Sequence, residues 1–494
     1  MPADASHDST IVIARHALPR RRRTKIVATL GPATDNPKTM EALIRAGVDV
    51  VRINFSHGDA STQAERVKLV RAVADKVGRY VGIMGDLQGP KIRIRTFRDG
   101  EARLEEGARF VLDSSLGTGE GDHQQVGVAY PDLVDDVEAG DTLLLDDGQI
   151  VLGVVEVAGP RIICSVTRGG LLKDRKGLNK QGGGLSAGAL TDKDRDDLVA
   201  AAALGVDFIA VSFVQDAGDI NEARRLLTEA GGTAHIIAKI ERAEAVDNIE
   251  SIIDASDAIM VARGDLAVEV GYAAMTGLQK GLIRTAVERN KVSITATQML
   301  ESMITSASPT RAEVSDVANA VLDGTDAVML SAETAVGENP VEAVRTMAKV
   351  CIGAEKHETS RGVTHARAND QFQHVDQAIA MAVMYAATHL DVRAIIALTE
   401  SGSTALWMSR RRTDIPIYAY TRQDKTRRRV TLYRGVFPVA FDVVSTPDEH
   451  VHEFAFEKLI GSGDLEQGDL VVFTQGQREG IAGGTNCMQI LKVP

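Results

Sequence analysis

The segment KIVATLGPATDNPKTMEALIRAGVDVVRINF, residues 25–55, decides the fold. It begins with a short apolar run at 25–30, continues with an amphipathic segment at 36–46, and ends with a second apolar run at 48–55. Short runs rich in β-branched residues are typical of strands, and the longer amphipathic pattern is typical of a helix. The order strand, helix, strand predicts two parallel strands joined by a right-handed crossover.

The same unit recurs along the chain. Six further strand-like runs occupy 81–86, 207–214, 235–241, 258–262, 292–297 and 327–330. Helical patterns separate most of them, for example at 59–77, 193–204, 219–230 and 274–289. Eight such units predict an α/β fold with a closed (β/α)₈ TIM barrel, in which the active site lies on the loops that follow the strands. A doubly wound open sheet is the structural alternative.

Other segments depart from this alternation. Residues 92–184 lack a helical period and contain β-like runs at 109–112, 142–145, 150–157 and 162–166, with Asp-Gly and Gly-Gly turns between such pieces. We expect them to form an inserted small β-barrel lid domain that closes over the chemistry. The barrel then comprises 20–91 and 185–350, a further α/β unit comprises 351–494, and residues 1–19 form an N-terminal tail.

The composition restricts the class of protein. The chain has 494 residues and a net charge of −12, which argues against general affinity for nucleic acid or an anionic membrane. Its three cysteines show no CxxC spacing, so the sequence supports neither a disulfide framework nor a zinc module. We find no secretory signal and no apolar run near the roughly 18 residues needed to span a bilayer. We therefore expect a cytoplasmic protein.

Polar side chains lie along one face of the run at 48–55. Arg52, Asn54 and Ser56 share this face, because alternate residues of a strand point the same way. Burying an unpaired charge costs free energy, so these side chains need polar or charged partners. They fit either a polar barrel interior with internal pairs or an anion site, in which Arg52 would hold a phosphate or a carboxylate.

Two later runs end in carboxylates. Lys239 and Glu241 share a face of the run at 235–241, and by themselves they are compatible with a simple ion pair. Asp265 follows the next run, beside Gly264, which permits close backbone approach. Two carboxylates on adjacent strands suit Mg²⁺, which prefers oxygen ligands. Together with Lys239 and Arg52 they indicate metal-assisted phosphoryl transfer.

Six stretches of the chain together resemble the pyruvate kinase family. They are TKIVATLGP (24–32), RINFSHG (52–58), AKIE (238–241), MVARGDL (260–266), ATQMLESM (296–303) and LSAET (330–334). They follow the family's order, and the likeness extends from residue 20 to the end. It implies the barrel, the inserted lid and a C-terminal regulatory domain. It also implies transfer of a phosphoryl group from phosphoenolpyruvate to ADP, which yields pyruvate and ATP in the final step of glycolysis.

The resemblance implies a role for individual residues. Arg52 would contact the phosphate and Lys239 would stabilise it during transfer, while Glu241 and Asp265 would hold one Mg²⁺ and a second Mg²⁺ would arrive with the nucleotide. The substrate would lie against Arg52, Ala262, Arg263, Gly264, Asp265 and Thr297. The nucleotide would lie against Asn54, Ser56, His57, Arg93 and Lys176. The proton relay to the enolate would include Thr297 and Ser331.

One segment departs from a common family pattern. Many members read DTKGPEIR and use K⁺ nearby, whereas this chain reads DLQGPKIR at 86–93. The equivalent of the K⁺ site here consists of Asn54, Ser56, Asp86, Leu87 and Lys91. Leu87 removes a hydroxyl ligand, and Lys91 brings a tethered ammonium. We expect Lys91 to replace K⁺, so that K⁺ is not required; a solvated hinge lysine is the alternative.

A loop near the C-terminal end has the composition of a phosphate-binding nest. It consists of Thr399, Glu400, Ser401, Gly402, Ser403 and Thr404. An ordinary capped helix is the alternative, and the resemblance favours a sugar-phosphate or AMP effector. We expect the arginines at 410–412 and 427–429 to be mostly solvated. The resemblance further implies a homotetramer.

Two rival functions remain open on the sequence. Another barrel enzyme that handles phosphoenolpyruvate or an enolate, such as a lyase, would share the metal carboxylates but would not need the nucleotide-side residues. A non-catalytic metabolite sensor would tolerate loss of Lys239, Glu241 and Asp265, and all three are present.

Overall fold

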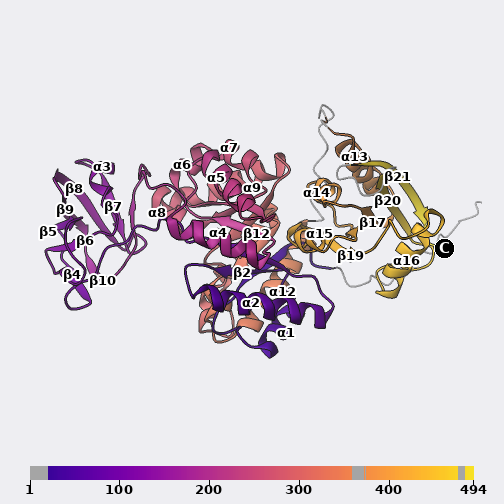
Figure 1. The fold of residues 1–494 in the computed structure, drawn as a ribbon, viewed down its shortest axis with the longest axis horizontal. Coiled ribbons are helices and arrows are strands. Elements are labelled where there is room, and N and C mark those ends of the chain that lie inside the picture. Colours follow the sequence, from indigo (N-terminus) through magenta and orange to yellow (C-terminus); the bar gives the residue numbers. More distant parts are fainter. Residues whose placement is uncertain (1–20, 359–371, 373, 477–483) are drawn as a thin grey trace, which may run out of the picture.

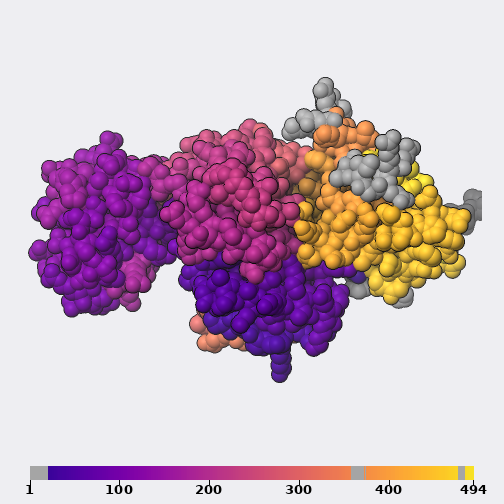
Figure 2. Space-filling view, in the orientation of Figure 1, coloured from indigo at the N-terminus to yellow at the C-terminus, as the bar shows by residue number. Residues whose placement is uncertain are grey.

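The computed structural model describes residues 21–358, 372, 374–476 and 484–494. The predicted tail at 1–19 lies outside these residues. Figure 1 shows three parts in a row: a β domain at one end, a barrel in the middle and a C-terminal α/β part at the other end. The space-filling view in Figure 2 shows the β domain joined to the barrel through a narrower region than the one that joins the C-terminal part.

The central part is a closed barrel of eight parallel strands, which confirms the predicted fold class. The order around the barrel is β1-β16-β15-β14-β13-β12-β3-β2. The strands are β1 (Lys25–Thr29), β2 (Val50–Asn54), β3 (Gly82–Asp86), β12 (Phe208–Val211), β13 (His235–Ile240), β14 (Ala258–Ala262), β15 (Val292–Ala296) and β16 (Ala327–Leu330). Each falls within a predicted strand-like run. Because the sheet closes on itself, the open-sheet alternative is wrong.

The helices of the barrel follow local signals in the sequence. The side chain of Asn36 caps the first helix by accepting a hydrogen bond from the Thr39 N–H, and Gly47 ends it at a φ of 118°. The helices and the 3₁₀ turn of this part are α1 (Pro37–Ala46), α2 (Ala60–Val77), α4 (Asp192–Leu204), α5 (Ala217–Glu229), α6 (Ala243–Asp247), α7 (Ile249–Ala255), α8 (Arg263–Val270), α9 (Tyr272–Glu288), η1 (Glu301–Ile304), α10 (Arg311–Asp323), α11 (Ala332–Ala335) and α12 (Pro340–Glu358).

The strand alternation sorts the barrel residues into two cores. Outward residues such as Ile26, Val51 and Ile53 pack against the surrounding helices. Inward residues such as Val50 and Met84 fill the barrel and belong to a different cluster. Arg52 and Asn54 share the inward face of β2 with Val50, which is how this strand presents polar groups to the barrel rim.

The β domain follows β3 and has its own core. Its six-stranded sheet has the order β11-β7-β8-β9-β5-β6, and a separate pair joins β10 to β4. The elements are β4 (Glu101–Leu104), β5 (Arg109–Asp113), β6 (Gln125–Gly127), α3 (Leu133–Asp136), β7 (Thr142–Leu145), β8 (Ile150–Ala158), β9 (Arg161–Arg168), β10 (Gly170–Lys173) and β11 (Leu178–Lys180). The predicted runs correspond to β5, β7, β8 and β9.

The C-terminal part is a five-stranded sheet in the order β19-β18-β17-β20-β21. Its elements are α13 (Val375–His389), β17 (Val392–Leu398), α14 (Ser403–Ser409), β18 (Ile417–Thr421), α15 (Asp424–Arg429), η3 (Val430–Leu432), β19 (Val436–Ala440), η4 (Asp448–His450), α16 (Val451–Gly461), β20 (Leu470–Gly476) and β21 (Thr485–Lys492). The sequence pattern did not predict β19. This strand contains Pro438, and it lies at the edge of the sheet, where a missing N–H is tolerated.

Arginines of the C-terminal part lie against the amino ends of the barrel strands. Arg410 donates to both carboxylate oxygens of Asp326, one of them at 2.7 Å, and its side chain is 3% exposed. Arg428 pairs with Asp207 at 2.9 Å, and Arg434 donates to the carbonyl oxygen of Thr325. The expectation of mostly solvated arginines is therefore wrong for Arg410, Arg427 and Arg428, because they meet carboxylates and other polar groups.

Within the described part of the chain, no helix is both long and apolar enough to cross a membrane.

Candidate active site

Arg52, on β2, meets Asp86 at the carboxyl end of β3. These strands are neighbours, and Arg52 Nε lies 2.5 Å from Asp86 Oδ2. A second Arg52 nitrogen donates to Thr29 Oγ1, at the end of β1. Asp86 is buried, which would raise its pKa, but the charges of Arg52 and Lys239 outweigh this effect and lower the pKa below its ordinary value. Asp86 is therefore an anion that holds two cations at the barrel rim.

Lys239, on β13, lies at the centre of the site. Its Nζ is 3.2 Å from Asp86 Oδ1 and 2.9 Å from Glu241 Oε1, and it donates to Ser212 Oγ at 2.6 Å. The ammonium thus reaches across the end of β12, which separates β3 from β13. Burial would lower the pKa of Lys239, but Asp86 and Glu241 raise it above its ordinary value. The group is a fixed, buried positive charge.

Ser212 and Thr29 complete this cluster, although the sequence analysis did not single them out. Ser212 follows the end of β12, and its hydroxyl donates to the carbonyl oxygen of Leu87 at 2.7 Å while it accepts from Lys239. The general expectation that residues after barrel strands form the site would have included it. Serine is common in loops, so its residue type gave no separate signal.

Glu241 and Asp265 follow the neighbouring strands β13 and β14. One oxygen of Glu241 accepts from the Phe213 N–H, and the other faces Lys239. Burial and the negative charge of Asp265 raise the pKa of Glu241 in spite of Lys239. The two carboxylates follow adjacent strands, and hard oxygen donors in such positions fit Mg²⁺, which keeps further positions for water and substrate.

Lys91 contacts the acid side of the same rim. Its Nζ lies 2.9 Å from Asp265 Oδ1. The structure brings these residues together across 174 positions of sequence, from the connection to the β domain and from the start of α8. Leu87, which precedes Lys91, is buried, and its N–H donates to the carbonyl oxygen of Ala210. Of the predicted K⁺-site equivalents, Asp86 thus lies beside Lys239, whereas Lys91 lies beside Asp265.

The residues predicted to bind the substrate meet at the carboxyl ends of the neighbouring strands β14 and β15. Thr297 Oγ1 accepts from the Gly264 N–H at 2.9 Å, and Arg263 donates to the carbonyl oxygens of Ala296 and Thr297. Ala262 is the last residue of β14. Thr297 has a φ of 65°, which is unfavourable for a β-branched residue. Such strain persists only where the surroundings hold it, as they do in functional turns.

Ser331 follows the last barrel strand, β16. Its N–H donates to Glu333 Oε2 at 2.6 Å, and the hydroxyl of Thr334 ties this turn to the carbonyl oxygen of Thr29. Ser331 therefore lies on the Arg52 side of the rim. Thr297 follows β15 and Ser331 follows β16, which is the next strand in the chain and the neighbour of β15 in the barrel.

The predicted nucleotide-side residues fall into two groups. Asn54, Ser56 and His57 form the turn after β2, where Asn54 Oδ1 accepts from the Ser56 N–H. Arg93 and Lys176 lie in the β domain: Arg93 donates to the carbonyl oxygen of Arg175, and Lys176 pairs with Asp146 at 2.7 Å. The contacts of Arg93 and Lys176 are thus made to the β domain and not to the cluster around Lys239.

The predicted effector loop lies in the C-terminal part, on the far side of the barrel from the β domain (Figure 1). Its residues satisfy one another: the Gly402 N–H donates to Thr399 Oγ1, and Ser401 Oγ donates to Ser403 Oγ. Glu400 receives hydrogen bonds from Arg422 and Gln423. Thr404 is buried against Thr485.

Comparisons with known proteins agree with this site. A family model described as "Pyruvate kinase, barrel domain" matches residues 21–344, and one described as "Pyruvate kinase, alpha/beta domain" matches residues 377–491. Pyruvate kinase II of Salmonella typhimurium is 54% identical over 96% of this chain and 99% of its own length. Pyruvate kinase of Haemophilus influenzae is 51% identical over 92% of this chain and 96% of its own length.

A solved structure supports the same conclusion. The crystal structure of a pyruvate kinase from Cryptosporidium parvum superposes with a TM-score of 0.87 at 34% identity, covering 96% of each chain. The lyase and sensor alternatives are not favoured by these matches. The chain belongs to the pyruvate kinase family, phosphotransferases that require Mg²⁺ and convert phosphoenolpyruvate and ADP to pyruvate and ATP.

Proposed function

We propose that phosphoryl transfer takes place at the rim where Arg52, Asp86, Lys239 and Glu241 meet. The observation that carries this proposal is the position of the Lys239 ammonium, which contacts Asp86, Glu241 and Ser212 at 3.2, 2.9 and 2.6 Å. Several anionic oxygens converge during transfer, so a fixed cation at this point offsets their repulsion. Arg52, which Asp86 holds in place, is the second cation and binds the phosphate of the substrate.

Glu241 and Asp265 are the residues that we propose to hold the resident Mg²⁺. When bound, this ion neutralises charge on the substrate oxygens that face it. The chain's own contribution is the pair of carboxylates on adjacent strands and the turn at Ala262, Arg263 and Gly264, which receives the substrate carboxylate. A second Mg²⁺ enters with the nucleotide, on the side of Asn54, Ser56 and His57.

The product enolate must gain a proton at carbon. We propose that the hydroxyls of Thr297 and Ser331 belong to this relay. Thr297 Oγ1 accepts from the Gly264 N–H and donates to the Ala296 carbonyl oxygen, so it is held on the substrate side of β15. Ser331 follows the neighbouring strand, β16.

The position of Lys91 is the observation behind the proposal that the reaction does not require K⁺. A tethered ammonium already lies at this rim, 2.9 Å from Asp265, and Leu87 offers no side-chain oxygen to K⁺. We propose that Lys91 supplies the monovalent charge that relatives take from K⁺.

The likeness to the family and the division of the fold support the remaining proposals. We propose that the chain divides into a barrel (20–91 and 185–350), a lid (92–184) that brings Arg93 and Lys176 to the nucleotide, and a regulatory part (351–494). We further propose that the loop Thr399–Thr404 binds a sugar phosphate or AMP, and that the protein is a cytoplasmic homotetramer.

A coupled assay of pyruvate formation tests the central proposal. The assay is run with phosphoenolpyruvate, with and without ADP, Mg²⁺ and K⁺, and with each candidate effector. We expect turnover to require ADP and Mg²⁺ but not K⁺. Pyruvate formation without ADP would contradict phosphoryl transfer, and strong dependence on K⁺ would contradict only the role of Lys91.

A further inference from the structure

The β domain is joined to the barrel by two chain segments that pair with each other. The outgoing segment, residues 87–94, leaves β3, and the return segment, residues 176–187, leads back toward α4. Arg93 of the outgoing segment pairs with Gly177 of the return segment in antiparallel register. Arg93 and Lys176 therefore lie on the same two-stranded ribbon, and a contact that fixes this ribbon to the barrel fixes both cations.

Helix α8 contacts both segments of the ribbon. It begins directly after β14 and lies on the side of the barrel that faces the β domain (Figure 1). In its first turn, Asp265 pairs with Lys91 of the outgoing segment at 2.9 Å. In its last turn, Glu269 Oε1 accepts a hydrogen bond from the side chain of Asn179, on β11 of the return segment, at 3.3 Å. Because Asp265 and Glu269 are four positions apart, they share one face of the helix.

The carboxylate of Glu269 joins three elements. While Oε1 accepts from Asn179 on β11, Oε2 accepts from the N–H of Ala243, the first residue of α6, at 3.0 Å. The backbone carbonyl oxygen of Glu269 also accepts from the Gly182 N–H at 3.1 Å. The exposed fraction is 3% for Glu269 and 7% for Asn179. Buried polar groups are costly to leave unpaired, so the loss of either side chain disturbs the contact between the β domain and the barrel.

The chain that follows β13 holds the same return segment. Arg242 donates to the carbonyl oxygen of Ala187 at 3.2 Å, and Glu244 accepts from the Gly184 N–H. Gly183 allows this close approach, because its φ is 81° and a Cβ at this position would lie 2.8 Å from Glu244 Oε1. Both loops that carry the proposed metal carboxylates therefore extend into contacts with the return segment.

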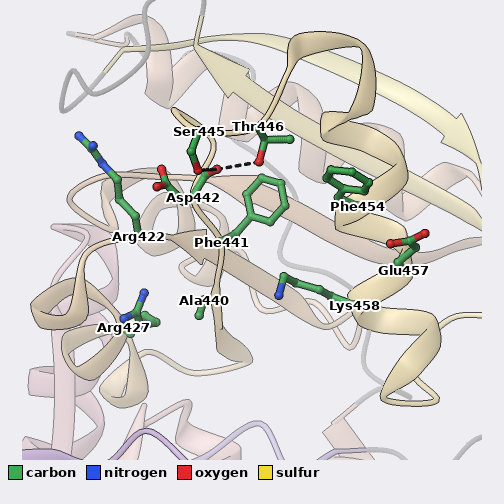
Figure 3. Close-up of a pocket in the computed structure, with 10 residues that line it drawn as sticks. All are labelled: Arg422, Arg427, Ala440, Phe441, Asp442, Ser445, Thr446, Phe454, Glu457 and Lys458. Carbon is green, nitrogen blue, oxygen red and sulfur yellow. Dashed lines mark hydrogen bonds between the residues drawn. The ribbon is translucent and has the colours of Figure 1, made fainter.

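The cavity of the C-terminal part has a different character. Its volume is about 570 Å³, and Figure 3 shows Arg422 and Arg427 on one side of it. Arg422 pairs with Glu400 and Arg427 pairs with Asp424, so these charges are neutralised within that part. The hydrogen bonds of Glu269, in contrast, cross from the barrel to the β domain.

We propose that Glu269 is a positioning residue for the nucleotide. Through Asn179 it fixes β11, which continues the strand that begins at Lys176 and pairs with Arg93. Because Glu269 belongs to the helix that also carries Asp265, this contact sets the position of the two lid cations relative to the metal site. The inference rests on the proposed role of Arg93 and Lys176 in binding the nucleotide.

Steady-state kinetics of the full-length protein test the proposal, with pyruvate formation as the readout. Asn179→Ala removes the donor to Glu269 and should raise the KM for ADP about fivefold or more. Its kcat and its KM for phosphoenolpyruvate should stay within about twofold of the parent, because Arg52 and the metal carboxylates remain in place. The matched control is Ser115→Ala, which removes a hydrogen bond of 2.5 Å to Asp113 inside the β domain and should leave both KM values unchanged.

A double-mutant cycle tests whether Glu269 and Asn179 act together. Glu269→Ala should raise the KM for ADP as well, and the double variant should be no worse than the more affected single variant, because both changes remove the same hydrogen bond. Effects that multiply would contradict the inference, and so would an Asn179→Ala variant with the parental KM for ADP or with equal rises for both substrates. If Glu269→Ala fails to fold, Asn179→Ala decides the question alone.

Lys176→Met separates this inference from the proposed function. If Lys176→Met raises the KM for ADP and Asn179→Ala does not, the lid binds the nucleotide and only the role of Glu269 is wrong. If Lys176→Met keeps the parental KM for ADP, the nucleotide role of this lid residue and our inference both fail. A parent protein that forms no pyruvate from phosphoenolpyruvate and ADP would overturn the proposed function and this inference together.

Discussion

Lys239→Met removes the cation on which the proposed chemistry depends. In the structure its Nζ lies 2.9 Å from Glu241 and 3.2 Å from Asp86. At an effective dielectric constant of about 20, each contact corresponds to roughly 5 kcal/mol of Coulomb energy before the cost of desolvation. Breaking a buried pair typically costs about 3–5 kcal/mol, and we expect the lower end because Arg52 still neutralises Asp86.

The catalytic loss should exceed any loss of substrate binding. Removing one fixed electrostatic donor from an active site commonly lowers kcat by about 10²–10³, and Lys239 supplies a full charge in a buried position, so we expect about 10³ or more. The KM for phosphoenolpyruvate should rise by less than about tenfold, because Arg52 and the turn at Gly264 remain.

Steady-state kinetics at saturating ADP and Mg²⁺ measure both quantities. Circular dichroism and a thermal melt establish that the variant is folded. Lys280→Met is the matched control, because Lys280 is a half-exposed lysine that pairs with Asp323 at the surface. A folded Lys239→Met variant with kcat within about tenfold of the parent would refute the role of this residue.

Three further predictions test other parts of the structure. Lys91→Glu should make activity depend on K⁺, whereas the parent stays active in a non-activating cation; equal dependence of both proteins on K⁺ would remove the proposed role. Burial raises the pKa of Glu269 to about 7 beside Asn179. The protonated form of Glu269 therefore contributes to the free energy of unfolding. This contribution is fully present below the pKa of the unfolded state and is lost as the pH rises through about 7. Glu269→Gln should therefore gain roughly 3 kcal/mol relative to the parent between about pH 4 and pH 8, measured by denaturant unfolding, and a gap that does not change with pH would contradict this. Arg410→Met leaves Asp326 buried without its partner and should destabilise the protein by about 3–5 kcal/mol, while adding Asp326→Leu should restore much of the loss; a double variant no more stable than the single one would argue against the ion pair.

The sequence was sufficient to predict the strands and helices that depend on residues close to them in the chain. All eight barrel strands lie within runs of β-branched and small apolar residues, and helices such as α1 and α2 begin at capping residues, Asn36 and Asp59, that are visible in the sequence. Alternation along a strand also predicted that Arg52 and Asn54 share a face with Val50. These features depend on neighbours a few positions away.

Features that depend on distant partners were not predictable in this way. The pairing of Lys91 with Asp265 spans 174 positions, and that of Arg410 with Asp326 spans 84. A run of arginines has the same composition whether water or a buried aspartate faces it, so composition favoured a solvated surface. The edge strand β19 was missed because Pro438 weakens the strand pattern, and only the sheet order shows that its position tolerates proline.

The hydrophobic interior of the barrel continues without a break into the C-terminal sheet. Val27, Met84 and Phe208 belong to the same packed cluster as Val430 and Tyr433, whereas the β domain keeps a cluster to itself. The β domain therefore has a hydrophobic core of its own, whereas the barrel and the C-terminal part share one. Recombination between related genes can exchange or shorten the β domain with little damage elsewhere. A chain that stops after α12 would instead expose the apolar residues of the barrel that pack against the C-terminal part, and it would precipitate. Divergence of the catalytic barrel and of the C-terminal sheet is consequently constrained jointly.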